Sequence, residues 1–454
     1  MSEVLQGDCL VKLKEIADNS VDAIITDPPY ELGFMGKKWD NSGIAYNVEM
    51  WKECLRVLKP GGYLLSFGGT RTYHRMACAI EDAGFEIRNM LEWIFASGFP
   101  KSQNIGKMYD KKMGNERKIT RKKPGTYADI RGKQHLHGDN IVKNRPRIKI
   151  IETKGTSPYE GLGTALKPAH EPIVCARKPL SEKTVVDNVI KWGTGGIEID
   201  ECRIPTSEDL AKNYNSIRKS DNKMGERIYK MGFRQGKDSV AKATDSTNLG
   251  RFPANVLCQD DALNDGEMTK GNGHWSKTKT IGFGKFGNGK SEYFGVGIKD
   301  NTVGSKSRYF DIDIWNEKYG LLQFPKASKS ERNRGLDGLE PKKKVFNGQS
   351  DKSSKNMKDV EKRFTTNPQQ NNHPTVKPLP LMRYLVTLVS RRGQTVLDPF
   401  AGSGTTLVAC KELGRNYIGI ELEEEYVPII EARLKATKEL EQFKQANLFE
   451  NSKK

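Results

Sequence analysis

The sequence predicts an α/β fold in which both ends of the chain build one mostly parallel sheet, and a long basic insert interrupts it. Two observations predict this fold. Strand-like and helix-like segments alternate over residues 1–100 and again over 371–454, which is typical of parallel strands joined by crossover helices. The middle lacks this alternation. A chain of 454 residues allows two to three domains, or one domain with a large insertion.

The first hundred residues predict three strands and two helices. The apolar run VDAIITD (21–27) is the first strand, YLLSFGG (63–69) the second and EIRNMLEWIFA (86–96) the third. Between them, VEMWKECLRVLKPGG has apolar residues at helical spacing and stops at Pro60-Gly61, and RTYHRMACAIEDAG ends at Gly84. Later, AHEPIVCARKP (169–179) predicts one more strand within the otherwise irregular middle.

Regular pattern returns near the C-terminus. LPLMRYLVTLVS (379–390) predicts a helix, TVLDPF (395–400) a strand, and GTTLVACKELG (404–414) a second helix. NYIGIEL (416–422) predicts a second strand, followed by a helix over EEYVPIIEARLKATKELEQF (424–443). These elements complete the sheet begun by residues 1–100.

The positive charge is concentrated in the middle of the chain. Residues 101–370 hold 53 Lys and Arg against 33 Asp and Glu, whereas 1–100 carry a net charge of −4 and 371–454 of +2. This distribution favours contact with a polyanion, with a solvated Lys-rich surface as the alternative. Residues 101–168 predict a basic loop region, and 180–370 predict a basic insert that, under the family resemblance described below, would bind DNA and recognise its target sequence.

The most unusual part of the insert is residues 271–310, with nine Gly and seven aromatic residues among lysines. Aromatic rings can stack on bases, and glycines let a backbone approach phosphates. Glycine turns over a small aromatic core explain the same composition equally well. The sequence leaves both interpretations open.

Composition also narrows the class of protein. The seven cysteines include no C-x-x-C pair, so they predict neither a disulfide framework nor a zinc site, and no metal is expected. The N-terminus has no apolar signal core, and no segment reaches the length of a membrane span. We therefore expect a cytoplasmic protein without a membrane partner.

VLDPFAGSGTT (396–406) predicts a ligand site, because a strand there runs through a Gly-rich turn into a helix. Gly402 and Gly404 let the backbone come near a ligand, and the helix that begins near Thr405 presents free N–H groups. Glu421 ends the next strand about 20 residues on, where an acid can accept hydrogen bonds from ribose hydroxyls. With Asp398 it makes an acidic site that suits a cationic nucleoside, and S-adenosylmethionine is the natural candidate.

Asp27-Pro28-Pro29-Tyr30, DPFAGSGTT and HPTVKP (373–378) occur in this order. Together they resemble the amino-group DNA methyltransferases, which methylate adenine N6 or cytosine N4, in their permuted β group. GTALKPAHEPIVCARKP and GRFPANV are similar to segments of phage-borne members. The resemblance implies a Rossmann-like, S-adenosylmethionine-dependent fold with a circularly permuted, mostly parallel seven-stranded sheet. It covers roughly residues 1–100, 169–179 and 371–454.

The resemblance implies direct methyl transfer to a base flipped out of duplex DNA. Asp27 and the Pro28 carbonyl would accept the two N–H bonds of the target amine, Pro29 would keep the turn rigid, and Tyr30 would stack on the base. Asp27 favours adenine N6, because cytosine-N4 enzymes usually carry Ser there, and cytosine N4 is the alternative. The sequence has no Pro-Cys pair, so a covalent cytosine-C5 mechanism is not expected.

The same resemblance assigns further cofactor contacts. Asp8 and Phe67 would lie near the adenine of S-adenosylmethionine, and Thr375 and Lys377 near its carboxylate. In the Gly-rich segment, Phe400 would join the four residues already named, which are Asp398, Gly402, Gly404 and Thr405. The sequence is compatible with a homodimer and with a cognate restriction endonuclease as a partner. Two other functions compete with DNA methylation: an RNA methyltransferase, or a DNA-binding protein without catalytic activity.

Overall fold

The computed structural model describes residues 2–33, 38–96, 98, 102–124, 149–206, 250–259, 262–263, 269–270, 303–304, 307, 310–318, 327, 329–341 and 370–440. It divides into two compact units. One unit comprises residues 1–97 with 170–454, and the other comprises 98–169.

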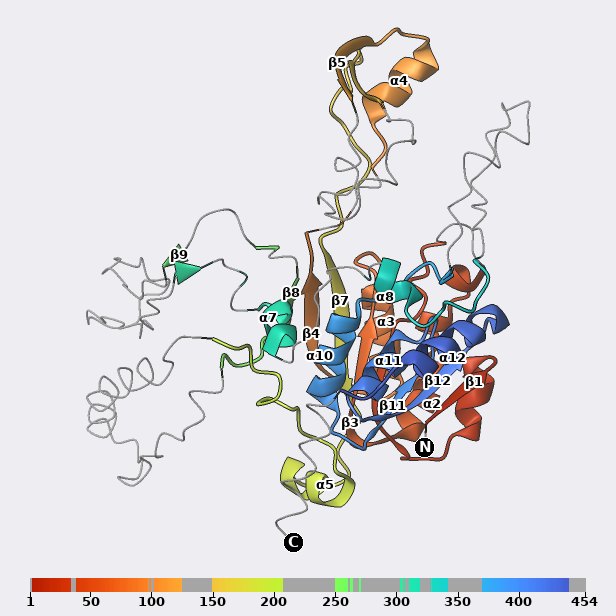
Figure 1. The fold of residues 1–454 in the computed structure, drawn as a ribbon, viewed down its shortest axis with the longest axis vertical. Helices are drawn as coiled ribbons and strands as arrows, with labels where there is room; N and C mark the ends of the chain where they lie inside the picture. Colours follow the sequence, from red (N-terminus) through yellow and green to blue (C-terminus); the bar gives the residue numbers. More distant parts are fainter. Residues whose placement is uncertain are drawn as a thin grey trace, which may run out of the picture. The chain divides into compact units, whose positions relative to one another are not determined.

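The larger unit contains an eight-stranded sheet of order β1-β12-β11-β2-β3-β7-β4-β8 (Figure 1). Neighbouring strands are parallel, except that β7 is antiparallel to both β3 and β4. The two chain ends meet in this sheet, because β2 pairs with β11 and β1 with β12. The predicted mostly parallel α/β sheet is therefore confirmed. Its strands are β1 (Glu3–Gln6), β2 (Val21–Thr26), β3 (Leu58–Phe67), β4 (Glu86–Ile94), β7 (His170–Arg177), β8 (Val256–Cys258), β11 (Thr395–Asp398) and β12 (Asn416–Glu421).

The sheet differs from the prediction at three places. Strand β1 was not predicted, because it has only four residues, none of them fully buried, and lies at the sheet edge. The eighth strand, β8, is a three-residue run inside the predicted insert. Strand β3 begins at Leu58 directly after helix α2 (Val48–Val57), so the helix ends before Pro60-Gly61 instead of at it.

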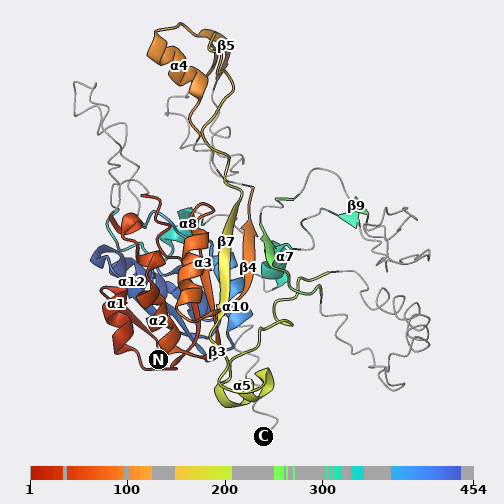
Figure 2. The same cartoon turned by 180° about the vertical axis from the view of Figure 1, so that it is seen from behind.

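Helices cover both faces of the sheet. Helices α1 (Cys9–Lys12), α2 and α3 (Tyr73–Asp82) lie on one face (Figure 2), and α10 (Leu379–Val389), α11 (Thr405–Glu412) and α12 (Val427–Ala436) lie on the other (Figure 1). Strand β2 serves both cores, because Ala23 and Ile25 pack in the α10–α11 core and Ile24 in the α2–α3 core. No helix in the described part of the chain is long and apolar enough to span a membrane.

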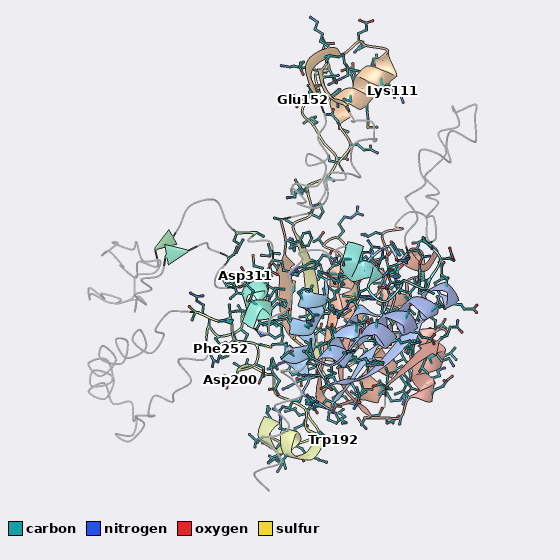
Figure 3. The ribbon with its side chains drawn as sticks, in the orientation of Figure 1. Lys111, Glu152, Trp192, Asp200, Phe252 and Asp311 are labelled. Atoms are coloured by element: carbon teal, nitrogen blue, oxygen red, sulfur yellow. The ribbon has the colours of Figure 1, made fainter. Side chains whose placement is uncertain are left out.

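Parts of the range predicted as the insert pack on this core. Trp315, on helix α7 (Ile312–Lys318), is fully buried and meets Tyr384 of α10 edge-on at 5.2 Å between ring centroids. Helix α5 (Val185–Trp192), with Trp192 labelled in Figure 3, is anchored by Asn188, which donates to the Pro60 and Thr194 carbonyls. The described part of this range also contains helix α8 (Lys329–Asn333) and two antiparallel two-residue strands, β9 (Thr269–Lys270) and β10 (Val303–Gly304). Most of the stretch 271–310 lies outside the described residues, so its interpretation stays a prediction.

The smaller unit, 98–169, contains a helix and a pair of antiparallel strands where the sequence predicts a loop. Helix α4 (Ile105–Met113) begins at Asn104, whose side chain accepts from the Lys107 N–H, and strands β5 (Lys118–Pro124) and β6 (Lys149–Lys154) are antiparallel. Lys111 on α4 and Glu152 on β6 are labelled in Figure 3. Arg117 pairs with both Asp110 and Glu160. The helix escaped prediction because its buried residues are Gly106 and Asp110, which form no apolar stripe.

Candidate functional site

The predicted site residues gather where the parallel strands end. Asp27 follows β2, Phe67 ends β3, Asp398 ends β11 and Glu421 ends β12. The carboxyl ends of parallel strands meet at one edge of a sheet, which is where open α/β folds bind ligands. The sheet topology therefore brings together motifs that are hundreds of residues apart in the chain.

Asp27 carries one occupied and one unoccupied oxygen. Its Oδ2 accepts a hydrogen bond from Lys377 Nζ at 2.7 Å. Its Oδ1 is buried and accepts no hydrogen bond from the described residues. A buried carboxylate oxygen without a donor is unfavourable by itself, so its presence here indicates a place for a ligand N–H or O–H.

Lys377 lies at the centre of this cluster. Its Nζ also donates to Tyr30 Oη at 3.0 Å and lies 3.3 Å from Glu171 Oε2. The Tyr30 hydroxyl in turn donates to the same Glu171 oxygen at 2.9 Å. The ammonium lies 4.8 Å from the centre of the Phe67 ring and 5.2 Å from that of Tyr30, within the range of a cation–π interaction.

The electrostatics of the cluster keep Lys377 charged. Burial alone would lower the pKa of Lys377, but Asp27 and Glu171 outweigh it, and the pKa lies above its ordinary value. Burial raises the pKa of Asp27, while Lys377 opposes that shift. Burial and the two carboxylates raise the pKa of Tyr30 well above its ordinary value, so Tyr30 stays a neutral phenol whose hydroxyl can donate a hydrogen bond.

Asp398 ties three elements together. Its Oδ1 accepts from Thr26 Oγ1 at 2.7 Å and from the Phe400 N–H at 3.1 Å, and its Oδ2 accepts from Thr406 Oγ1 at 2.6 Å. Strand β2, strand β11 and helix α11 are thereby joined at the site edge. Burial raises the pKa of Asp398 to about 6. A direct contact of Asp398 with a cofactor stays a prediction.

Glu421 holds the Gly-rich turn and still has acceptor capacity. Its Oε2 accepts from the Gly402 N–H at 2.7 Å and its Oε1 from the Glu423 N–H at 2.9 Å. An ionised carboxylate offers about four acceptor sites, so sites remain for two hydroxyls. Burial raises the pKa of Glu421 to about 7.

The glycines of the turn are required by both backbone and space. Gly402 has φ of 57° and Gly404 of 76°, in the left-handed region that favours glycine. A Cβ on Gly402 would lie 2.9 Å from His373 Nε2, and one on Gly404 would lie 2.9 Å from Ile430 Cγ2. Gly404 is also the N-cap of α11, so the turn leads directly into a helix N-terminus. Thr405, the first residue of α11, is held there by Arg433, whose Nη1 donates to its Oγ1 at 3.1 Å.

Three predicted residues stand apart from the Asp27 cluster. Asp8 is exposed and caps α1 by accepting from the Leu10 N–H at 2.8 Å. Thr375 is exposed, and its carbonyl lies 2.9 Å from His373 Nδ1. Phe400 is partly buried and packs against the α2–α3 core. Their contacts with a cofactor stay predictions.

The structure adds residues that sequence reasoning missed. Glu171, in β7, joins Tyr30 and Lys377, while Thr26 and Thr406 hold Asp398. Nothing in AHEPIVCARKP shows that β7 runs antiparallel, and for this reason Glu171 was missed. Once that direction is known, an acid at the start of the strand lies at the edge where the parallel strands end.

Helix α8 fixes the HPTVKP segment that carries Lys377. Arg332 Nη2 donates to the His373 carbonyl at 2.7 Å, and Glu331 Oε1 accepts from the Leu379 N–H at 2.7 Å. The His373 ring also meets Tyr426 edge-on at 4.7 Å between centroids. Lys377 is thus held between a helix of the predicted insert and the start of α10.

A cofactor that is a cationic nucleoside fits the residues present. The ends of β11 and β12 offer spare acceptor sites on Glu421 and a turn in which Gly402 and Gly404 carry no side chain. The carboxylates of Asp27, Glu171 and Glu421 outnumber Lys377, the cation among them. Among the described residues, no group of three or more His, Cys, Asp or Glu is arranged to hold a metal ion.

Comparison with known families gives one match that spans most of the chain. The model of the N6/N4 family described as DNA methylase matches residues 21–432. The motifs at Asp27 and at the Gly-rich turn both fall inside this range.

Individual relatives match only in short segments. The type II methyltransferase M2.DpnII of Streptococcus pneumoniae is 48% identical over 67 residues, which is 15% of this chain and 25% of the relative. The type II methyltransferase M.HindIII of Haemophilus influenzae is 55% identical over 56 residues, which is 12% of this chain and 18% of the relative. The matched segments thus span a quarter or less of these relatives.

Solved structures resemble the chain distantly. The M1.HpyAVI–SAM complex has a TM-score of 0.35 at 15% identity, covering 96% of this chain and 100% of that one. The cytosine-N4-specific PvuII DNA methyltransferase has a TM-score of 0.40 at 13% identity, covering 95% of this chain and 85% of that one.

Proposed function

The chain belongs to the N6/N4 DNA methylase family, and from this premise we propose that it transfers a methyl group from S-adenosylmethionine to the N6 amino group of adenine in duplex DNA. Transfer is site-specific and direct, on a base flipped out of the helix. The observation that carries the proposal is the buried, unoccupied Oδ1 of Asp27 at the end of β2.

Asp27 answers the chemical problem of this reaction. An exocyclic amine is a poor nucleophile, because its lone pair is delocalised into the ring. Asp27 Oδ1 and the Pro28 carbonyl accept its two N–H bonds and favour a pyramidal nitrogen with a localised lone pair. Proline fixes φ and donates no N–H, so Pro28 and Pro29 keep that carbonyl in position. Tyr30, whose hydroxyl is anchored on Glu171, presents its ring to the flipped base.

The cofactor half of the site lies at the ends of β11 and β12. S-adenosylmethionine, when bound, supplies an electrophilic methyl group on a sulfonium. Glu421 accepts hydrogen bonds from the ribose hydroxyls, and the turn through Gly402 and Gly404 leaves room for the nucleoside. The ring of Phe67, buried at the end of β3, flanks the adenine. Positioning and electrostatics are the main contributions to the rate.

Duplex DNA as the substrate is supported by charge. The excess of 53 Lys and Arg over 33 Asp and Glu within residues 101–370 matches a protein that neutralises phosphates. Adenine is preferred over cytosine because an acid, Asp27, occupies the first position of the DPPY element.

Two measurements on wild type and Asp27→Ala test the proposal. One is transfer of a labelled methyl group from S-adenosylmethionine to plasmid DNA, and the other is binding of S-adenosylmethionine. Wild type should label DNA, and D27A should bind the cofactor but lose transfer by about 100-fold or more. Full activity of D27A would refute the role of Asp27. Label in RNA instead of DNA would identify an RNA methyltransferase, and DNA binding without label would identify a silent DNA-binding protein.

A further inference from the structure

Glu171 is the one acid of the Asp27 cluster that lies on the antiparallel strand β7. Its Oε2 accepts from Tyr30 Oη at 2.9 Å and lies 3.3 Å from Lys377 Nζ, and 26% of its side chain is exposed. It faces Trp93 across the β4–β7 register. The proposed methyl transfer assigns no contact of Glu171 to the target base or the cofactor.

Three oxygen atoms surround the ammonium of Lys377. An ammonium has three N–H donors, and Lys377 Nζ has three oxygen partners, Asp27 Oδ2 at 2.7 Å, Tyr30 Oη at 3.0 Å and Glu171 Oε2 at 3.3 Å. Two of these contacts are hydrogen bonds, and Glu171 attracts the ammonium as an ion pair. Glu171 therefore competes with Asp27 Oδ1 for the remaining donor, and Oδ1 accepts none from the described residues.

We propose that Glu171 is a positioning residue for methyl transfer, which engages Lys377 and the Tyr30 hydroxyl and thereby keeps Asp27 Oδ1 open for the target amine. This inference rests on the proposed function. Without an acceptor at position 171, one Lys377 donor and the Tyr30 hydroxyl would be free to turn toward Asp27. They would then occupy the acceptor that the amine needs.

The charged groups around Glu171 set the sign of a pH effect. Lys377 faces it from the HPTVKP segment, and Asp27 and Tyr30 face it from the turn after β2. Asp398, from β11, interacts with Asp27 as a like charge. The negative charge of Glu171 raises the pKa of Asp27. A neutral hydrogen-bond acceptor in place of Glu171 should therefore move the acid limb of the pH–rate profile for methyl transfer to lower pH.

Single-turnover methyl transfer in full-length protein, followed from pH 5 to 9, tests this. Glu171→Ala should slow transfer by about tenfold or more, since it gives competing donors to Asp27. Glu171→Gln keeps an acceptor oxygen, so it should recover most of the rate, with its acid limb at lower pH than in wild type. Glu92→Ala, on the neighbouring strand β4, is the matched control and should behave as wild type.

The outcomes separate the two proposals. Equal rates for E171A, E92A and wild type would overturn the role of Glu171 while leaving the proposed function intact. An E171Q variant that transfers the methyl group as slowly as E171A, but has the melting temperature of wild type, would overturn that role as well. If E171A melts at a lower temperature than wild type, only E171Q is informative. An acid limb of its pH–rate profile at the same pH as in wild type would then overturn the inference. Wild type that methylates no DNA would remove both proposals together.

Discussion

At the scale of single residues, the site concentrates carboxylates that burial makes reluctant to ionise. Burial raises the pKa of Glu421 to about 7 and that of Asp398 to about 6. Both acids lie at strand ends where the proposed cofactor brings a positive charge. Their ionisation therefore couples cofactor binding and folding stability to pH.

Cofactor affinity should fall as the pH drops through about 7. Above that pH, Glu421 is ionised and can accept hydrogen bonds from the ribose hydroxyls. Below it, the protonated acid has lost its charge and part of its capacity to accept hydrogen bonds. Calorimetric titration with S-adenosylmethionine from pH 6 to 8.5 measures this. Glu421→Gln should bind about tenfold more weakly at pH 8 and lose most of the pH dependence. A wild-type pH dependence in E421Q would contradict the assignment.

The same acid should destabilise the cofactor-free protein at high pH. A carboxyl whose pKa is raised by folding contributes full stability below its unfolded pKa, and this contribution is lost as the pH rises through its folded pKa, here about 7. E421Q should therefore melt above wild type at pH 8, and the difference should shrink toward pH 5. Thermal melts without cofactor test this sign. A variant less stable than wild type at pH 8 would show that the Gly402 and Glu423 hydrogen bonds dominate.

At the scale of elements, local patterns predicted the strands that carry the proposed site residues, and long-range pairing brings those strands together. The DPPY turn and the Gly-rich turn are each one continuous segment of sequence, so the strand before each turn could be predicted. Glu171 could not be placed by local pattern, because its contact with Lys377 depends on β7 running antiparallel between β3 and β4. Helix α4 was missed for the opposite reason, since it buries a glycine and an acid instead of an apolar stripe.

The turn before α11 should tolerate no side chain at Gly404. Its φ is 76°, and an added Cβ would lie 2.9 Å from Ile430 Cγ2. Gly404→Ala should cost about 1–3 kcal/mol of unfolding free energy and weaken cofactor binding. Gly196→Ala is the control, because no described atom lies within 4 Å of its added Cβ. Equal denaturant midpoints for the two variants would contradict this account of the turn.

At the scale of the whole molecule, the sheet depends on both chain ends but not on residues 98–169. That segment forms its own compact unit. In the chain, this segment connects the end of β4 to the start of β7, where Ile94 is paired with His170. A short loop can therefore join the two strands as a hairpin.

Replacing residues 98–169 by a short Asn-Gly loop should leave the rest folded. Melting and S-adenosylmethionine binding should stay close to wild type, because all eight strands of the large sheet, β1 to β4, β7, β8, β11 and β12, are retained. DNA binding should weaken and depend less on salt, since residues 101–150 alone hold 15 Lys and Arg against 4 acids and each lost phosphate contact lowers the salt slope by about 0.9. Unchanged DNA affinity and salt slope would exclude this unit from the DNA interface.

The measurement that tests the central claim most directly is mass spectrometry of nucleosides from plasmid DNA incubated with the protein and S-adenosylmethionine, beside an Asp27→Ala control. The account predicts N6-methyladenine with wild type and none with D27A. N4-methylcytosine would keep the chemistry of the site and correct the base. Absence of any methylated base in the wild-type sample would contradict the proposed function.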